Sequence, residues 1–299
     1  EYNGVKLKRD LHDSRPASEL IAEATSLAKT ADLVIFIGGL NKSDRQDSEG
    51  NDRESLSLSY GQDKVISELA KANKNFVVVN ISGNAVAMPW INEVPSIVQT
   101  WYNGTESGTA LASILTGDAN PSGKLPFTFP VKLEDNGAHK LGDYPGVNKE
   151  ATYKESIFVG YRWIDKEKIK PLFPFGHGLS YTTFEYGDIK LNSNKMNENG
   201  SVEASITVSN TGDKDGNEIV QLYIRDEAAS ISRPVKELKG FEKIFLKAGE
   251  TKTVKFTITA DQLKFYNYDI VFFCEPGMFE VMIVLYIQVV LSSIYEIVK

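Results

Sequence analysis

The chain has 299 residues, of which 41% are hydrophobic and 24% charged, and this length exceeds the usual single domain of roughly 100 to 200 residues, so two globular domains are expected. Its net charge of −7 argues against nucleic-acid binding, because a surface that neutralises phosphates needs an excess of Lys and Arg. Cys274 is the only cysteine, which excludes an intrachain disulfide.

The first part of the chain alternates helical and strand patterns. Apolar residues recur at helical spacing in some segments, and others are short, continuous apolar runs. Helices are expected at residues 16–29, 60–72 and 107–115, and strands at residues 33–37, 75–81 and 96–101. Strands that are apolar on both faces and alternate with helices predict an α/β domain built on a parallel sheet.

The second part has a different pattern. Residues 119–183 are punctuated by Pro and Gly, which predicts a wrapping connection. Segments with period two then follow at residues 201–208, 219–224 and 251–258, and they predict a β-sandwich. We therefore expect an α/β domain with its connection at residues 1–183 and a sandwich at residues 184–299.

An apolar run at residues 282–291 stands near the end of the chain. A membrane helix needs about 20 apolar residues, and Gln288 interrupts a run of only about ten, so no membrane partner is expected. Two interpretations stay open: two adjacent sandwich strands, or a change of reading frame near the end of the gene. In either case the run is an aggregation risk if it is left unpaired.

A polar loop follows the first expected strand and carries several carboxylates. Ligands in open α/β sheets bind beyond the carboxyl ends of the strands, which is where residues 47–53 lie. Glu49 precedes Gly50, which permits close backbone approach, and Arg53 is placed to orient a carboxylate. Glu49 is therefore a candidate general acid, and the alternative is a solvated surface loop.

Several motifs occur in one order along the chain. Gly-Gly-Leu-Asn at residues 38–41 precedes Glu-Gly-Asn-Asp-Arg at 49–53, and Pro-Phe-Gly-His-Gly-Leu-Ser-Tyr stands at 174–181. Further matches lie at residues 99–108, 117–126, 157–162 and 233–243. Together they resemble the third family of glycoside hydrolases, the β-glucosidase and β-xylosidase group. The resemblance covers that family's α/β domain and its trailing fibronectin-III-like domain, from about residue 33 to about residue 277.

The resemblance implies a retaining exo-β-glycosidase of carbohydrate metabolism, in which two carboxyl groups about 5 to 5.5 Å apart act as nucleophile and acid/base. By its place in the Glu-Gly-x-Asp-Arg pattern, Glu49 matches the acid/base residue. The family's nucleophile is an Asp in a separate amino-terminal barrel, usually within a Ser-Asp-Trp run, and this sequence contains no such run. The resemblance also implies an additional strand and helix upstream. We therefore expect the carboxyl-terminal part of an enzyme, with the amino-terminal barrel missing and no activity in isolation.

Other residues compete for roles in this site. Asp44, Asp47, Asp52 and Glu54 share the loop with Glu49, and Asp52 and Arg53 are interpreted as an ion pair that pins it. Rings that suit sugar stacking are Trp90, Trp101, Tyr102 and Trp163, but core or interface anchors are the favoured interpretation. No substrate-binding residue is assigned.

No cofactor or metal is expected. His12, His139 and His177 lack metal-ligand spacing and cysteine partners, and His177 is interpreted as structural. Gly38 and Gly39 follow a strand, but no dinucleotide fingerprint or Walker run accompanies them.

Three functions stay open. The first is the carboxyl-terminal part of an exo-β-glycosidase, with a β-linked glucoside or oligosaccharide as substrate and the missing barrel as partner. The second is a non-catalytic carbohydrate-binding or interaction module, and the third is an inactive truncated product. The resemblance slightly favours a periplasmic or secreted location and does not distinguish glucose from xylose, because it places most of the sugar pocket in the barrel.

Overall fold

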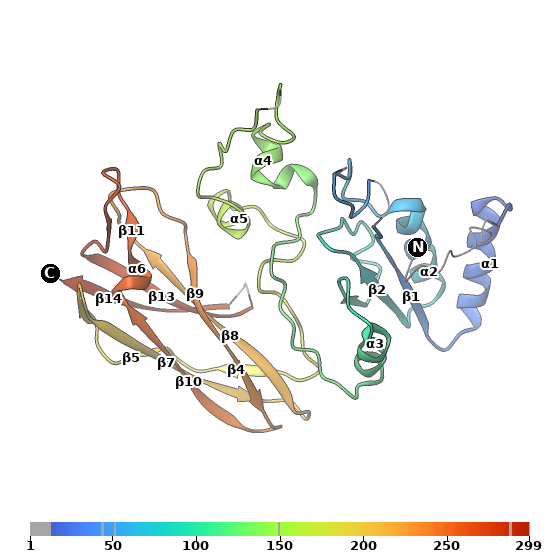
Figure 1. Cartoon of the computed structure of the whole chain (residues 1–299). Helices are drawn as coiled ribbons and strands as arrows, with labels where there is room; N and C mark the ends of the chain where they lie inside the picture. The colour runs from blue at the N-terminus through green and yellow to red at the C-terminus, as the bar shows by residue number, and fades with distance from the viewer. Residues whose placement is uncertain (1–12, 43–44, 51, 149, 287–288, 299) are drawn as a thin grey trace. The chain divides into compact units, whose positions relative to one another are not determined.

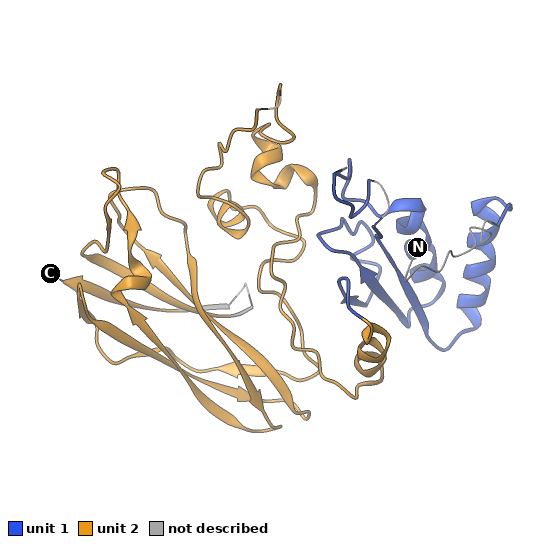
Figure 2. Cartoon of the chain, in the orientation of Figure 1, with its two compact units in different colours: residues 1–104 blue, residues 105–299 orange. Residues whose placement is uncertain are grey.

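The computed structural model describes residues 13–42, 45–50, 52–148, 150–286 and 289–298. The chain divides into two compact units, residues 1–104 and residues 105–299, which Figure 2 shows in different colours. The predicted division between residues 183 and 184 stays a prediction, because the compact units group residues by contact, whereas a domain is a part that can fold alone.

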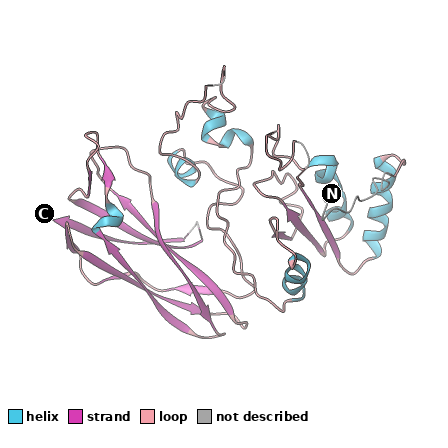
Figure 3. Cartoon of the chain, viewed as in Figure 1, coloured by secondary structure: helices cyan, strands magenta, loops and turns pink. Residues whose placement is uncertain are grey.

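The first unit is built on a parallel sheet of three strands (Figures 1 and 3). β1 (Val34–Gly39) and β3 (Ser96–Gln99) flank β2 (Phe76–Ile81), and both pair with it in parallel register. β2 is the most buried of the three strands, and its Phe76, Val78 and Val79 side chains are each at most 1% exposed. The parallel pairing of β1, β2 and β3 confirms the parallel sheet that the apolar runs predict.

The described part of the first unit also contains two helices, of which the second packs on the sheet and the first packs on the second helix. α1 (Ala17–Thr30) and α2 (Gln62–Ala72) match the predicted segments, and a short 3₁₀ turn, η1 (Ser59–Gly61), leads into α2. α2 turns Ile66, Leu69 and Ala70 inward, as the apolar spacing predicts. The third predicted helix is α3 (Ser107–Thr116), which belongs to the second unit.

The connection in the second unit is more than an irregular loop. It contains η2 (Leu133–Asp135), α4 (Gly137–Lys140) and α5 (Tyr161–Lys166), and α5 buries Trp163. Its contacts with the sandwich include a buried ion pair in which Lys124 Nζ lies 3.2 Å from Glu218 Oε1. These contacts explain why the connection and the sandwich form one compact unit.

The sandwich consists of two antiparallel layers. One layer has the strand order β10-β7-β4 with β5 also on β7, and the other has the order β6-β14-β13-β8-β9, in which only β6 and β14 run parallel. The strands are β4 (Phe184–Tyr186), β5 (Lys190–Leu191), β6 (Lys195–Asn197), β7 (Ser201–Asn210), β8 (Gly216–Asp226), β9 (Glu237–Leu246), β10 (Thr251–Thr259), β13 (Gly277–Tyr286) and β14 (Val289–Val298). A short helix, α6 (Ala260–Leu263), and a hairpin of β11 (Phe265–Tyr266) and β12 (Phe272–Phe273) complete the unit.

The apolar run near the end of the chain forms adjacent strands. β13 pairs antiparallel with β14 on one side and with β8 on the other, which confirms the interpretation as two adjacent strands for the described residues of 282–291. The change of reading frame stays a prediction. Gln288, which argued against a membrane helix, lies outside the described residues. Over the described part of the chain, none of the helices has the length and apolar character that a membrane crossing needs.

Candidate active site

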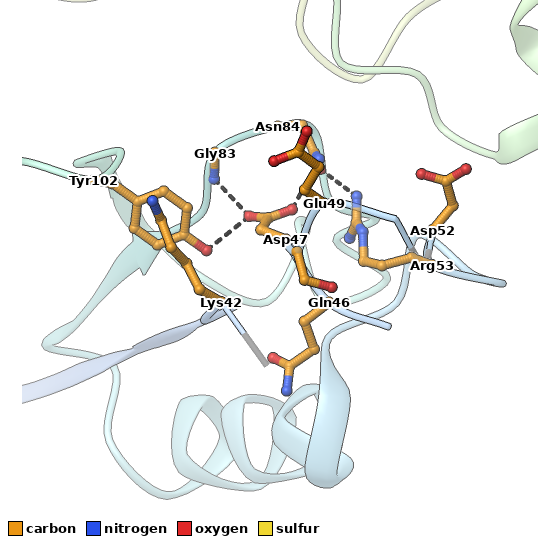
Figure 4. Close-up of a pocket in the computed structure, with 10 residues that line it drawn as sticks. Lys42, Gln46, Asp47, Glu49, Asp52, Arg53, Gly83, Asn84 and Tyr102 are labelled. Carbon is orange, nitrogen blue, oxygen red and sulfur yellow. Dashed lines mark hydrogen bonds between the residues drawn. The ribbon is translucent and has the colours of Figure 1, made fainter. Parts of the chain in front are cut away.

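The three parallel strands end at one edge of the sheet, and a polar pocket of about 420 Å³ lies there (Figure 4). Its walls come from the loop after β1, the turn after β2 and the segment after β3. The lining residues are Lys42, Gln46, Asp47, Ser48, Glu49, Asp52, Arg53, Gly83, Asn84 and Tyr102. The position agrees with the expectation that ligands bind beyond the carboxyl ends of parallel strands.

The end of β1 fixes where the loop departs. A Cβ at Gly39 would lie 2.0 Å from the carbonyl oxygen of Ile81, and its φ is +138°, so the neighbouring strand end requires glycine here. The Gln62 side chain accepts from the amide of Gly39 at 2.7 Å and donates to its carbonyl at 2.8 Å. The first turn of α2 thereby fastens the point from which the loop begins.

Asp47 is the most extensively bonded carboxylate of the pocket. Its Oδ2 accepts from the amide of Gly83 at 2.7 Å and from the hydroxyl of Tyr102 at 2.8 Å, and its Oδ1 accepts from Asn84 Nδ2 at 2.8 Å. Burial raises the pKa of Tyr102, and the hydrogen bond to Asp47 raises it further, so the phenol keeps its proton and donates. Asp47 thus joins the loop to the segments that follow β2 and β3.

Arg53 makes a second connection to the same turn. Its Nη2 donates to Asn84 Oδ1 and, at 2.7 Å, to the carbonyl of Ala85. Burial lowers the pKa of Arg53, and the charge of Asp47 opposes that shift. Asp52 is exposed, and no ion pair joins it to Arg53 in the described part of the chain, so the expected Asp52–Arg53 pair is wrong. The guanidinium instead turns toward the residues after β2.

Glu49 lies on the loop between these two connections. It is exposed, it lines the pocket, and among the described residues its carboxylate forms no hydrogen bond or ion pair. Gly50 follows with a φ of +92°, a backbone conformation that glycine adopts without strain. The loop therefore presents the Glu49 carboxylate to solvent without a partner among the described residues, while its flanks are fixed, an arrangement suited to exchanging protons with a ligand.

The other acidic candidates are placed differently. Glu54 is 81% exposed and pairs with Arg45 at 3.1 Å, outside the pocket lining. Asp52 is exposed and lines the pocket, and Asp44 lies outside the described residues. The structure thus brings Asp47, Glu49 and Asp52 together and leaves Glu54 apart.

Two of the four aromatic candidates are core residues. Trp90 is fully buried and donates to Asp63 at 2.8 Å, and Trp163 is 4% exposed. Tyr102 lies in the pocket, where Lys42 Nζ stands 5.9 Å from its ring centroid. The core interpretation is confirmed for Trp90 and Trp163, whereas Tyr102 belongs to the candidate site.

The two histidines that the structure describes, His139 and His177, do not line this pocket. The His177 ring stacks on Phe173 with centroids 5.1 Å apart, and burial lowers the pKa of His177. His139 packs against Tyr144, and His12 lies outside the described residues. Within the described ranges, no group of three His, Cys, Asp or Glu residues is arranged to hold a metal ion.

Sequence reasoning missed Gly83 and Asn84. Both lie just after the carboxyl end of β2, at the same sheet edge as the Glu49 loop. The rule that ligands bind beyond the carboxyl ends of parallel strands therefore also points to these two residues. The pocket is rich in carboxylate, amide, ammonium and guanidinium groups, which suits a ligand with many hydroxyls.

Comparison with known proteins identifies relatives of both parts of the chain. Residues 4–181 match the family described as "Glycosyl hydrolase family 3 C-terminal domain", and residues 218–284 match the "Fibronectin type III-like domain". A β-glucosidase of Bacteroides ovatus is 53% identical over 261 residues, covering 86% of this chain and 35% of that protein. Thermostable β-glucosidase B of Acetivibrio thermocellus is 44% identical over 281 residues, covering 94% of this chain and 36% of that protein.

Solved structures agree with these relatives. A β-glucosidase from Kluyveromyces marxianus in complex with glucose superposes with a TM-score of 0.88 at 37% identity, covering 96% of this chain and 34% of that chain. A β-glucosidase from Streptomyces venezuelae in complex with D-glucose has a TM-score of 0.86 at 36% identity, covering 93% of this chain and 35% of that chain. The chain thus spans about a third of the length of these relatives.

Proposed function

The chain belongs to glycoside hydrolase family 3, and from this premise we propose that it supplies the acid/base residue, Glu49, of a retaining exo-β-glycosidase acting on terminal β-linked glucosides. The observation that carries the proposal is the position of Glu49: its carboxylate lines a polar pocket at the carboxyl end of the sheet and has no partner among the described residues. The glucose bound in the Kluyveromyces marxianus relative supports glucose as the terminal sugar.

The reaction needs a second carboxylate that acts as nucleophile. Asp47 is poorly suited to that role because three donors already occupy its oxygens. We propose that the nucleophile comes from a domain outside these residues. Glu49 then protonates the departing glycosidic oxygen while the nucleophile bonds to the anomeric carbon. In the second step the Glu49 carboxylate takes a proton from water, whose oxygen replaces the nucleophile.

The first test concerns the chain by itself. Because the proposed nucleophile lies outside these residues, we expect the purified 299-residue protein to release no aryl alcohol from an aryl β-glucoside above the uncatalysed rate. Turnover by the isolated chain would show that it contains a complete catalytic pair. If the chain binds sugar but shows no turnover even when it is joined to a barrel domain, a carbohydrate-binding module is favoured instead.

The second test assigns Glu49. In a chimera where this chain replaces the matching region of the Bacteroides ovatus β-glucosidase, Glu49→Ala should slow glucosides with poor leaving groups by about 10²- to 10⁴-fold. Activated aryl glucosides should lose much less, because their leaving groups depart without protonation. Azide should partly restore turnover and yield a β-glucosyl azide, since it attacks the glycosyl-enzyme without a general base.

A matched control separates this role from general loss of charge. Glu54→Gln removes a carboxylate from the same loop, but Glu54 lies outside the pocket lining, so this change should leave both substrate types unaffected. Equal losses of Glu49→Ala on both types of substrate, without azide rescue, would remove Glu49 from the acid/base role.

A further inference from the structure

The loop that carries Glu49 is fastened on both sides to one side chain. Two residues before Glu49, Asp47 accepts from Asn84 Nδ2 at 2.8 Å, and four residues after it, Arg53 donates to Asn84 Oδ1. Figure 4 shows the Asn84 side chain above Asp47 and on the side of Arg53. We call this set, Asp47, Asn84 and Arg53, the loop bracket.

The turn that bears Asn84 is itself fixed by buried groups. The hydroxyl of Ser82, which is fully buried, donates to the carbonyl of Asn84 at 2.8 Å. Asn80 Nδ2 donates to that hydroxyl at 3.0 Å and to Gln99 Oε1 at 2.6 Å. Because these groups belong to β2 and β3 or directly follow β2, Asn84 is anchored to the sheet rather than to the loop.

A carboxylate that serves as general acid must be held close to the geometry of the reaction, because small displacements cost large factors in rate. Glu49 has no anchor of its own among the described residues. We propose that Asp47 and Asn84 are positioning residues, which hold the Glu49 loop against the sheet through the loop bracket. This inference rests on the proposed function of Glu49 only for its catalytic consequence.

The chemistry of the bracket gives a reciprocal test. In Asp47→Asn, the remaining side-chain oxygen at position 47 still accepts from Gly83 and Tyr102, but the new amide group faces the amide of Asn84. If the Asn84 side-chain amide flips, its oxygen can accept from the new amide at position 47, but its NH2 group then faces the guanidinium of Arg53, which is also a donor. In Asn84→Asp, two carboxylates face each other.

The swap Asp47→Asn with Asn84→Asp restores every bond. The new amide at position 47 then donates to one oxygen of the new carboxylate at position 84, and Arg53 donates to the other oxygen, with the net charge unchanged. The two single variants and the swap therefore form a double-mutant cycle. The loop bracket predicts that the swap is less damaging than the sum of the two single changes.

The first readout needs no catalysis. Hydrogen exchange of residues 45–54 is measured by mass spectrometry on the full 299-residue chain. Each single variant should speed exchange by about 10-fold or more, as expected for losing hydrogen bonds to a charged group, and the swap should return it to within about threefold of the original. Glu54→Gln, which removes only an exposed ion pair, should change nothing. Unchanged exchange in the single variants, or no recovery in the swap, would refute the loop bracket, and this result does not depend on the catalytic role of Glu49.

The second readout is kinetic and uses the Bacteroides ovatus chimera. The single variants should lower kcat on poor leaving groups more than on activated ones, with KM changing less, and the swap should restore kcat. Normal kcat in both single variants, in an enzyme that Glu49→Ala disables, overturns the positioning role. Failure of Glu49→Ala to affect turnover refutes the proposed acid/base function instead, and the exchange measurements still decide the bracket.

Discussion

Tyr295 tests whether the end of the chain packs as the structure has it. The side chain is fully buried on β14, lies opposite Phe279 on β13, and stacks on it with ring centroids 5.7 Å apart. Its hydroxyl is buried, and within the described structure no hydrogen-bond partner reaches it. The ring and the hydroxyl should therefore contribute to stability with opposite signs.

The magnitudes follow from those contacts. Removing the ring in Tyr295→Ala should cost about 3 to 5 kcal/mol, reduced by about 1 kcal/mol because an unpaired hydroxyl leaves the core. Tyr295→Phe removes only the hydroxyl and should stabilise the sandwich by about 1 kcal/mol. For a unit of this size, 1 kcal/mol corresponds to about 2 to 4 °C in Tm. Ile294→Ala is the control, because Ile294 is 48% exposed on the other face and should cost about 1 kcal/mol or less.

Calorimetric unfolding of the full chain measures these shifts, since it resolves units that melt separately. We expect Tm to rise for Tyr295→Phe and to fall steeply for Tyr295→Ala. If Tyr295→Ala costs no more than Ile294→Ala, β14 does not pack on β13 as described. If Tyr295→Phe destabilises the protein, the hydroxyl has a partner that stabilises the fold.

Three further predictions concern the second unit. Lys124→Met should destabilise it by about 3 to 5 kcal/mol in chemical denaturation, because the buried Glu218 loses its cation; a cost below about 1 kcal/mol would contradict this. Burial raises the pKa of Asp143, but hydrogen bonds from Lys154 and Thr152 outweigh it and lower this pKa to about 2 from the ordinary 3.8. The stabilisation by Asp143 is therefore full above about pH 4 and is lost as the pH falls toward 2. The Lys154 amide donates to Asp143, so its NMR shift should titrate with a midpoint near 2 rather than near 4. Limited proteolysis should cut between residues 132 and 154 before it cuts the strands of the first unit; a first cut within residues 76–81 would refute that order.

The sequence alone determined the secondary structure wherever its periodicity was unambiguous. The continuous apolar run at residues 76–79 has no polar face to leave in water, so it becomes the central strand β2. The strict alternation at residues 201–208 places every second side chain of β7 in the sandwich core. Both signals are local, because the pattern of one segment states how many of its faces are buried.

The location of the candidate site was also within reach of the sequence. Parallel strands bring their carboxyl ends to one edge, so a carboxylate loop after the first strand had to lie there. Among the carboxylates of that loop, only the resemblance to the family's Glu-Gly-x-Asp-Arg pattern favours Glu49, and its role stays a prediction. The core or interface interpretation of the four aromatic candidates rests on the tendency of large rings to be buried, and it holds for Trp90 and Trp163, whereas Tyr102 lines the pocket.

Only the tertiary structure decided which polar groups meet. Arg53 was paired with its neighbour Asp52, yet its partners are Asn84 and Ala85, more than thirty residues away in the chain. Asp47 likewise bonds to groups that follow β2 and β3. Which donor reaches which oxygen depends on the register of the strands and on the turns that end them, to within tenths of an ångström, and sequence spacing carries no information at that resolution. The sequence therefore placed Glu49 at the sheet edge, whereas the side chains that hold its loop there became apparent only once the strands were paired.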